Sequence, residues 1–256
     1  MTARQIYEII NEVAPFETQS EFDNSGFLAG SPSREVSGIL FALDVTEPVI
    51  DEALALGANP IVTHHPLMFT ARRTMTDEDY EGRLISRMME NRISLIAAHT
   101  NLDQAPGGIN DTLAALCGLT DVSGEGFFRC GFLPEPLPAA ELKDNLSDAL
   151  EATVRLMGPE DALIRKLGLC SGGGSDEWVR AEEAGCDAFL SGEIKHHHAL
   201  AMADRGIAAF ECGHFATEAP GLFALAEALQ NALYEIECTI RVFKSAVPAY
   251  CFPLQP

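Results

Sequence analysis

The chain has 256 residues, 47% of them hydrophobic and 21% charged, which is enough apolar material for a folded core and excludes a disordered or fibrous protein. Its 17 basic and 38 acidic residues give a formal net charge of −21, which disfavours binding to nucleic acid or to an anionic membrane surface. No apolar run approaches the roughly 20 residues of a membrane-spanning helix, and the N-terminus lacks a signal-peptide core, so a cytoplasmic location is expected.

The N-terminal half of the sequence predicts alternating helices and short apolar strands. A helix over residues 3–13 is expected because its isoleucines share one face, and Thr2 is its N-cap. A strand over 36–43 is followed by a helix that begins near Thr46 and ends at Gly57. The remaining elements of this half are a strand over 60–63, a helix over 79–92, a strand over 93–98 and a helix over 108–117.

The C-terminal half continues the same alternation after a proline-rich stretch. A strand over 127–133 leads into three prolines within 134–138, which predict a linker. The alternation predicts an α/β protein with largely parallel sheets, built as modules over 1–125 and 126–256, with the last strand a candidate to return to the first module. The predicted elements after the prolines are helices over 139–152, 176–184, 197–204 and 217–232, and strands near 153–157, 163–170, 187–190, 207–211 and 237–243.

Two features that resemble functional sites have simpler structural explanations. The seven cysteines are scattered and form no CxxC pair, so most are expected to be small buried residues. The loop SGGGS at 171–175 lies between a predicted strand and a helix but matches neither GxGxxG nor a P-loop. It therefore predicts close backbone packing rather than a phosphate site.

The histidines are confined to four short segments. They are His64 and His65, His99, His196 to His198, and His214. Three of these segments, PIVTHHP, LIAAHTNLD and AAFECGHFATE, directly follow predicted strands. Ligands of open α/β sheets bind beyond the carboxyl ends of strands, so the three segments are expected to face one crevice. The alternative for each single histidine is a hydrogen-bonded loop residue.

The side chains in these segments form a donor set suited to transition metals. His214 and Glu218 are four residues apart and share a face if a helix begins there. With His64, His65 and Asp103 they supply three imidazoles and two carboxylates, which suit zinc, manganese or iron(II) better than calcium. Five ligands exceed one tetrahedral site, so a two-metal site with a bridging carboxylate accounts for the surplus.

Six stretches of the sequence resemble one known family in both content and order. They are FDNSGFLAG (22–30), ALDVTEPVIDEAL (42–54), IVTHHPLMF (61–69), AAHTNLDQAPGGINDTLA (97–114), LSGEIKHHHALAMADRGIA (190–208) and ECGHFATEAPGL (211–222). The chain is similar to the NGG-one-interacting-factor-three-like family, whose bacterial members are called dinuclear metal-centre hexameric proteins or GTP cyclohydrolase I type 2 homologues. The resemblance spans nearly the whole chain and fits the short form of the family.

The resemblance implies a fold, a ligand set and an assembly. The implied fold is two interdigitated α/β modules with the metal site in the cleft between them, and the implied assembly is a homohexameric ring. The implied ligands of two divalent ions, zinc, manganese or iron, are His64, His65, Asp103, His214 and Glu218, with Glu218 as the bridge.

The chain departs from the family pattern at a few positions. Phe22 occupies a place where the family commonly has tryptophan, and Glu193 a place where it has aspartate. The family often has lysine just after the HHPLxF stretch, and here Arg72 and Arg73 are the candidate replacements.

The expected function is that of a dinuclear metal-dependent hydrolase. The resemblance implies GTP cyclohydrolase I type 2-like opening of the guanine imidazole ring, and a phosphoester substrate fits the same two ions. His99 is the candidate for proton transfer or substrate contact. His197 is expected to border the metal site or to contact substrate, with His196 and His198 partly exposed. The alternative is a non-catalytic metal-binding regulatory or metal-handling protein.

Overall fold

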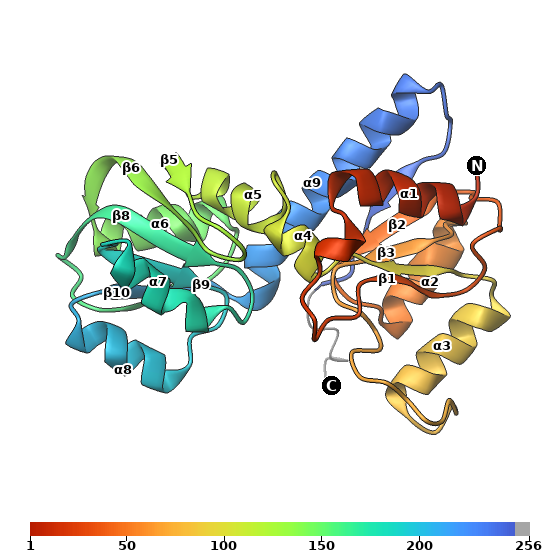
Figure 1. The fold of residues 1–256 in the computed structure, drawn as a ribbon, viewed down its shortest axis with the longest axis horizontal. Coiled ribbons are helices and arrows are strands. Elements are labelled where there is room, and N and C mark those ends of the chain that lie inside the picture. The colour runs from red at the N-terminus through yellow and green to blue at the C-terminus, as the bar shows by residue number, and fades with distance from the viewer. Residues whose placement is uncertain (249–256) are drawn as a thin grey trace, which may run out of the picture. The chain divides into compact units, whose positions relative to one another are not determined.

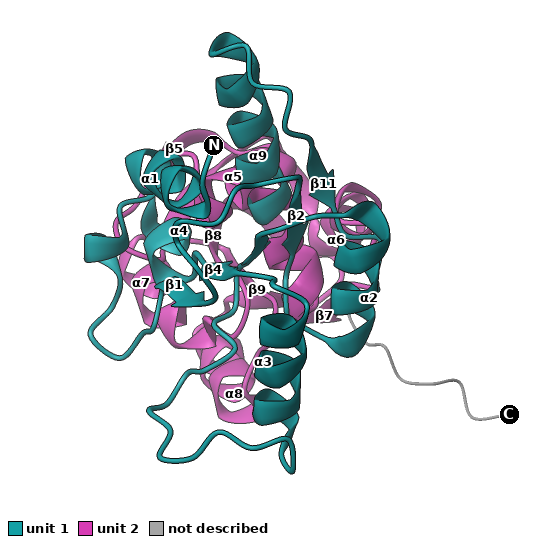
Figure 2. Cartoon of the chain, turned by 90° about the vertical axis from the view of Figure 1, so that its right-hand side faces the viewer, with its two compact units in different colours: residues 1–105, 222–256 teal, residues 106–221 magenta. Residues whose placement is uncertain are grey.

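The computed structural model describes residues 1–248, and the chain divides into two compact units. The first unit holds residues 1–105 and 222–256, and the second holds residues 106–221 (Figure 2). Each unit contains one mixed β-sheet with helices on both of its faces (Figure 1). The predicted α/β class is therefore confirmed. The first sheet is largely parallel as expected, whereas the second combines parallel and antiparallel pairs. Among the described residues, no helix has the length and apolarity to cross a membrane.

The first unit is built on a five-stranded sheet in the order β1-β4-β3-β2-β11. Its strands are parallel except β1, which runs antiparallel to β4, and the last strand of the chain, β11, pairs with β2. The elements of this unit are α1 (Ala3–Val13), η1 (Phe16–Thr18), β1 (Gly26–Ala29), β2 (Ile39–Ala42), α2 (Glu47–Leu56), β3 (Ile61–Thr63), α3 (Tyr80–Glu90), β4 (Leu95–Ala97), α4 (Thr100–Gln104) and β11 (Val242–Lys244).

The helix ends of the first unit follow the local sequence signals. Thr2 caps α1 in a capping box with Gln5, and Thr46 caps α2. Gly57 ends α2 with φ at 62°, a left-handed conformation that glycine adopts without strain. Helices α2 and α3 pack on one face of the sheet through a core that includes Ile50 and Met88. Helix α1 covers the other face (Figure 1).

The second unit is built on a six-stranded sheet in the order β5-β6-β8-β9-β10-β7. Strands β8, β9 and β10 are parallel and form its centre, and the other strands pair antiparallel. The elements of this unit are α5 (Ile109–Leu116), β5 (Thr120–Ser123), β6 (Arg129–Pro138), α6 (Ala139–Ala149), β7 (Arg155–Met157), β8 (Leu163–Cys170), η2 (Ser175–Glu177), α7 (Trp178–Glu183), β9 (Ala188–Ser191), α8 (His196–Asp204) and β10 (Ala208–Glu211). Helix α9 (His214–Glu235) begins in this unit and ends in the first.

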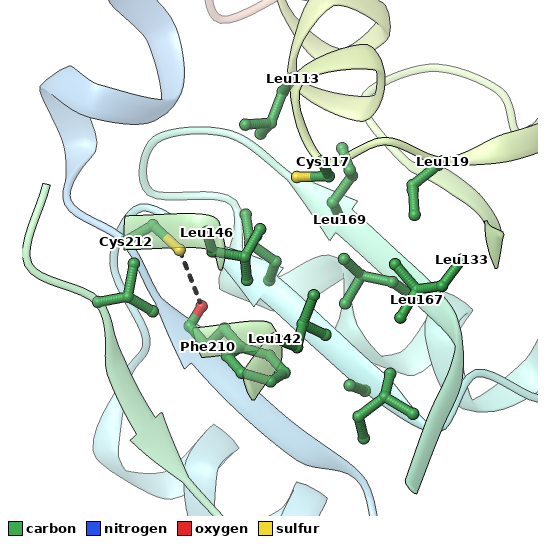
Figure 3. Packing of buried hydrophobic residues seen from close by; sticks show 14 of the residues in the cluster. Leu113, Cys117, Leu119, Leu133, Leu142, Leu146, Leu167, Leu169, Phe210 and Cys212 are labelled. Atoms are coloured by element: carbon green, nitrogen blue, oxygen red, sulfur yellow. Dashed lines mark hydrogen bonds between the residues drawn. The ribbon is translucent and has the colours of Figure 1, made fainter. Parts of the chain in front are cut away.

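Two apolar cores cover the two faces of the second sheet. Leucines of α5 and α6 pack against β8 and β10 on one face (Figure 3). Helices α7 and α8 pack on the other face against Phe189. Cys212 is fully buried in the first of these cores, its thiol donates to the Phe210 carbonyl oxygen at 3.9 Å, and burial raises its pKa. All six described cysteines are free and five are buried, which confirms their expected packing role; Cys251 lies outside the described residues.

The predicted linker at residues 134–138 is wrong, because these prolines continue strand β6. Pairing of β6 with β5 ends at Phe132, so the proline segment has a sheet neighbour, β8, on one side. A proline has no N–H to donate, and such an edge position tolerates it. The units also differ from the expected modules 1–125 and 126–256. Helix α5 and strand β5 pack with the second sheet, and the C-terminal part of α9 belongs to the first unit. The last strand, β11, pairs with β2 of the first sheet, as expected.

Candidate metal centre

Three histidines gather at the carboxyl ends of β3 and β4 in the first unit. These strands are parallel neighbours with Thr63 opposite Ala97, so the residues that follow them leave the same edge of the sheet. The ring centroids of His64, His65 and His99 lie 5.0–5.6 Å apart. Their ligand nitrogens all lie within 4.8 Å of one another, which is compatible with a metal ion.

Each of these imidazoles is held through Nδ1 by an oxygen atom. Nδ1 of His64 lies 2.9 Å from the Ala98 carbonyl oxygen. Nδ1 of His65 lies 2.7 Å from Asp44 Oδ1, and Nδ1 of His99 lies 2.8 Å from Asp23 Oδ1. When Nδ1 donates to an oxygen, Nε2 is the nitrogen with the lone pair, and this arrangement is typical of metal-binding histidines.

The short helix α4 positions Asp103 beside His64. The Asp103 N–H donates to the His99 carbonyl oxygen at 3.0 Å. The Asp103 side chain lies close to His64, with 3.5 Å between Asp103 Oδ1 and His64 Nε2. This separation exceeds a normal N–H···O hydrogen bond and matches the roughly 3.4 Å between two ligand atoms on one tetrahedral ion. Because His64 is fully buried and Asp103 is 7% exposed, a cation between them would offset the desolvation of the carboxylate.

Asp23 supports the His99 ring, a contact that the sequence did not predict. Its buried carboxylate accepts hydrogen bonds from the Ser25 hydroxyl and the Thr100 N–H, besides its contact with His99. Burial opposes ionisation of this group, but the hydrogen bonds from His99 and Thr100 outweigh it and hold the pKa of Asp23 below its ordinary value. Asp23 therefore fixes the orientation of the His99 ring.

Replacing Asp23 by asparagine is expected to lower the free energy of unfolding near neutral pH by an amount on the order of 1 kcal/mol. Because the folded-state pKa of Asp23 is depressed, its contribution is present above the ordinary value of 3.8 and is lost as the pH falls below it. The difference between the wild type and the variant should therefore shrink in acid. Urea unfolding across this pH range measures it, with the exposed Asp77→Asn as control; a difference that does not vary with pH would contradict the assignment.

In the second unit, His214 and Glu218 lie on the first turns of α9. The helix begins at His214, so the spacing of four residues places both side chains on one face. His214 Nε2 lies 3.1 Å from Glu218 Oε2, and His214 Nδ1 lies 2.8 Å from Glu193 Oε1. Glu193 follows β9 and His214 follows β10, so this set also lies at the carboxyl ends of parallel strands.

The glycine loop at 171–175 packs directly on this pair. Gly172 has φ at +54°, and its N–H donates to Thr217 Oγ1 at 3.0 Å. A Cβ atom on Gly172 would lie 2.0 Å from Glu218 Oε1 and 3.1 Å from His214 Nε2. The predicted close packing of the loop is therefore confirmed, and the residue it packs against is the carboxylate expected to bridge two metal ions.

The three consecutive histidines at the start of α8 have different environments. His198 is 9% exposed, its Nδ1 lies 3.1 Å from Ser175 Oγ, and burial lowers its pKa. The expectation that His198 is partly exposed is wrong, because this face of α8 packs on η2. His196 and His197 are exposed. The role of His197 beside substrate stays a prediction.

If His197 contacts substrate, His197→Ala should weaken substrate affinity about tenfold and leave the metal content unchanged. His196→Ala is the matched control, because His196 is also exposed and precedes it on the same helix turn. Titration calorimetry together with elemental analysis measures both quantities. Equal effects of the two substitutions would contradict the assignment.

The two arginines after the HHPLMF segment have different surroundings. The Arg72 guanidinium forms ion pairs with Asp79 and Glu81, which hold it on the loop before α3. The Arg73 side chain is exposed. Of the two candidate replacements for the family lysine, Arg73 is therefore the one without a carboxylate in contact within the described residues.

The sequence and the fold agree on one family. Residues 1–248 match the family Duf34/NIF3 (NGG1p interacting factor 3). The chain belongs to this family. It is 30% identical to a "GTP cyclohydrolase 1 type 2 homolog" of Clostridium acetobutylicum, over 98% of this chain and 99% of that protein. A protein of the same name from Streptomyces coelicolor is 33% identical, over 84% of this chain and 81% of the relative.

Two solved structures share the whole fold of this chain. Staphylococcus aureus protein SA1388 superposes with a TM-score of 0.92 at 25% identity, covering 100% of this chain and 99% of that one. Reduced HcgD from Methanocaldococcus jannaschii superposes with a TM-score of 0.83 at 28% identity, covering 96% and 98%. The histidine and carboxylate sets of this family member are compatible with divalent metal binding by donor type and by spacing.

Proposed function

We propose that the protein is a metal-dependent hydrolase in which five side chains hold two divalent ions per chain. The proposed ligands are His64, His65, Asp103, His214 and Glu218, with Glu218 as the bridge. The observation that carries the proposal is the shared geometry of the histidines. Each holds Nδ1 against an oxygen atom, and in two of them Nε2 faces a nearly buried carboxylate, at 3.5 Å and 3.1 Å.

Bound divalent ions would polarise the bond under attack and acidify a water molecule. The protein's own groups then orient and move protons. His99 lies beside the proposed ligands and has Asp23 on Nδ1, so its Nε2 can accept a proton while Asp23 stabilises the resulting imidazolium. Asp44 and Glu193 play the corresponding orienting role for His65 and His214.

The proposed substrate is a nucleotide, and GTP is the first candidate. The name shared by the bacterial relatives, "GTP cyclohydrolase 1 type 2 homolog", supports opening of the guanine imidazole ring; a phosphoester is the second substrate class. The test is a screen of nucleotides and phosphoesters with protein loaded separately with zinc, manganese and iron(II), with products identified by mass spectrometry. Turnover that disappears in His99→Ala at unchanged metal content supports the proposal, and no turnover with any loaded form contradicts it.

A second candidate function, non-catalytic metal handling, is favoured by the burial of part of the ligand set. His64 is fully buried, and Asp103 and Glu218 are 7% and 5% exposed, which suits an ion enclosed by protein. Chelator competition separates the two functions. An enzyme keeps its ions while it turns over substrate, whereas a metal-handling protein transfers them to a chelator or an acceptor protein without substrate.

We also propose that the chain assembles as a homohexamer. The family resemblance supports this, and exposed apolar side chains such as Tyr234 and Ile236, 65% and 59% exposed at the end of α9, are the kind of surface that closed symmetry buries. Multi-angle light scattering is expected to give the mass of six chains at micromolar concentration. A monomeric mass would contradict the proposal.

A further inference from the structure

An exposed pair of phenylalanine rings borders the histidine cluster of the first unit. Phe22 is 62% exposed and Phe69 is 46% exposed, although both side chains are wholly apolar. Their ring centroids lie 6.2 Å apart at an interplanar angle of 42°. The Phe69 ring also meets the His99 imidazole edge-on, at 6.0 Å and 77°. The three rings form one aromatic surface beside the candidate metal ligands.

The backbone beneath these rings is fixed by specific contacts. Phe22 directly precedes Asp23, whose carboxylate holds His99 and the start of α4. Phe69 directly follows Met68, which packs against the core of the first unit. The Asn24 side-chain amide donates to the Met68 carbonyl oxygen at 2.5 Å and joins the two loops. The rings are therefore presented to solvent by two loops that are tied together.

We propose that Phe22 and Phe69 form a stacking platform for the planar heteroaromatic ring of a purine-type substrate. This inference rests on the proposed function and deepens it, because it assigns the part of the substrate that these residues would hold next to the metal centre. Aromatic pairs favour centroid separations of about 4.5–7 Å, and both phenylalanines are exposed enough for a further ring to approach them. Exposed apolar side chains that lie together are typical of binding surfaces.

The charge of the protein favours a ring contact over a phosphate contact as the source of affinity. With a formal net charge of −21, the chain repels a free polyphosphate. Stacking of a base on an aromatic side chain carries no such penalty and depends little on which base is bound. The platform should therefore bind GTP and ATP alike, and the groups at the metal centre would select between them.

The test is calorimetric titration of metal-loaded protein with GTP, ATP and inorganic triphosphate, the last being a probe without a ring. Phe22→Ala and Phe69→Ala are each expected to weaken GTP and ATP binding about tenfold and to leave triphosphate binding within about twofold. Phe69→Trp, which keeps an aromatic ring at this position, should bind GTP and ATP as tightly as the wild type does. Phe132→Ala is the matched control, because Phe132 is 45% exposed and lies in the second unit. Elemental analysis of each variant verifies that the metal content is unchanged.

Three results would overturn the platform. They are unchanged nucleotide affinity in both alanine variants, an equal loss for triphosphate, and a changed light-scattering mass, which would identify the rings as a contact with a second copy of the chain. A failure of the proposed reaction can be distinguished from a failure of the platform. If the wild type does not convert GTP while purine binding still depends on the rings, the platform stands without the reaction. If GTP is converted and the variants bind it normally, the reaction stands without the platform.

Discussion

Replacing Glu218 by alanine is expected to reduce the metal content from about two ions per chain to nearly none. Its carboxylate is the proposed bridge, so its removal takes a ligand from both ions. Asp103→Ala is expected to remove about one ion, because Asp103 Oδ1 lies 3.5 Å from His64 Nε2 and Asp103 is not the proposed bridge. Elemental analysis after metal loading and desalting measures both variants.

The control for this experiment is Glu227→Ala, a substitution on the same helix. Glu227 is exposed and pairs with Lys244, away from the histidines in the sequence and in its contacts. Its metal content should equal that of the wild type. If Glu218→Ala retains one ion, the residue is an ordinary ligand and the bridge is wrong; if it retains both, the ligand assignment itself is wrong.

Gly172→Ala is expected to abolish metal binding nearly as completely as Glu218→Ala, although glycine has no side chain to bind a metal. An alanine Cβ would lie 2.0 Å from Glu218 Oε1, so the carboxylate has to move away from His214. The positive φ of 54° adds a conformational cost of about 1–2 kcal/mol for any other residue. The free energy of unfolding should therefore fall by at least this amount.

The neighbouring glycine provides a matched control for this effect. Gly173 has no atom within 4 Å of the position that a Cβ would take, and it does not have a positive φ. Gly173→Ala should therefore keep its metal ions and change the free energy of unfolding by less than about 0.5 kcal/mol. Urea unfolding and elemental analysis of the two variants, measured in parallel, separate the effect at Gly172 from a general effect of alanine in the loop. Equal metal contents would contradict the proposed contact.

Local signals in the sequence were sufficient to locate most elements of the fold. Helix α1 with its Thr2 cap and helix α2 between Thr46 and Gly57 have the predicted ends, because capping and left-handed termination are interactions within a few residues. Elements without a local signature were missed. Helix α4 is one turn long, and β5 is exposed throughout, so neither has apolar periodicity to reveal it.

The sequence also indicated which side chains to consider at the metal centre. His64, His65 and His99 follow strands that are apolar enough to recognise, and parallel strands present their carboxyl ends at one edge. The spacing of His214 and Glu218 on a helix is likewise a local property. Assignment of these residues as metal ligands needed the whole donor set and the family resemblance, because a lone histidine after a strand is more often a hydrogen-bonded loop residue.

Only the tertiary structure determined which residues support these side chains. Asp23 and Glu193 contact histidines 76 and 21 residues away, and no local pattern encodes a pairing across such distances. The same holds for Gly172, because a side chain at this position would collide with Glu218, which lies on a different element. The prolines of β6 predicted a linker instead of a strand for a related reason. Proline is tolerated at a sheet edge, where a neighbouring strand is missing on one side. Which strands are neighbours is determined by long-range pairing and not by the residues of the strand itself.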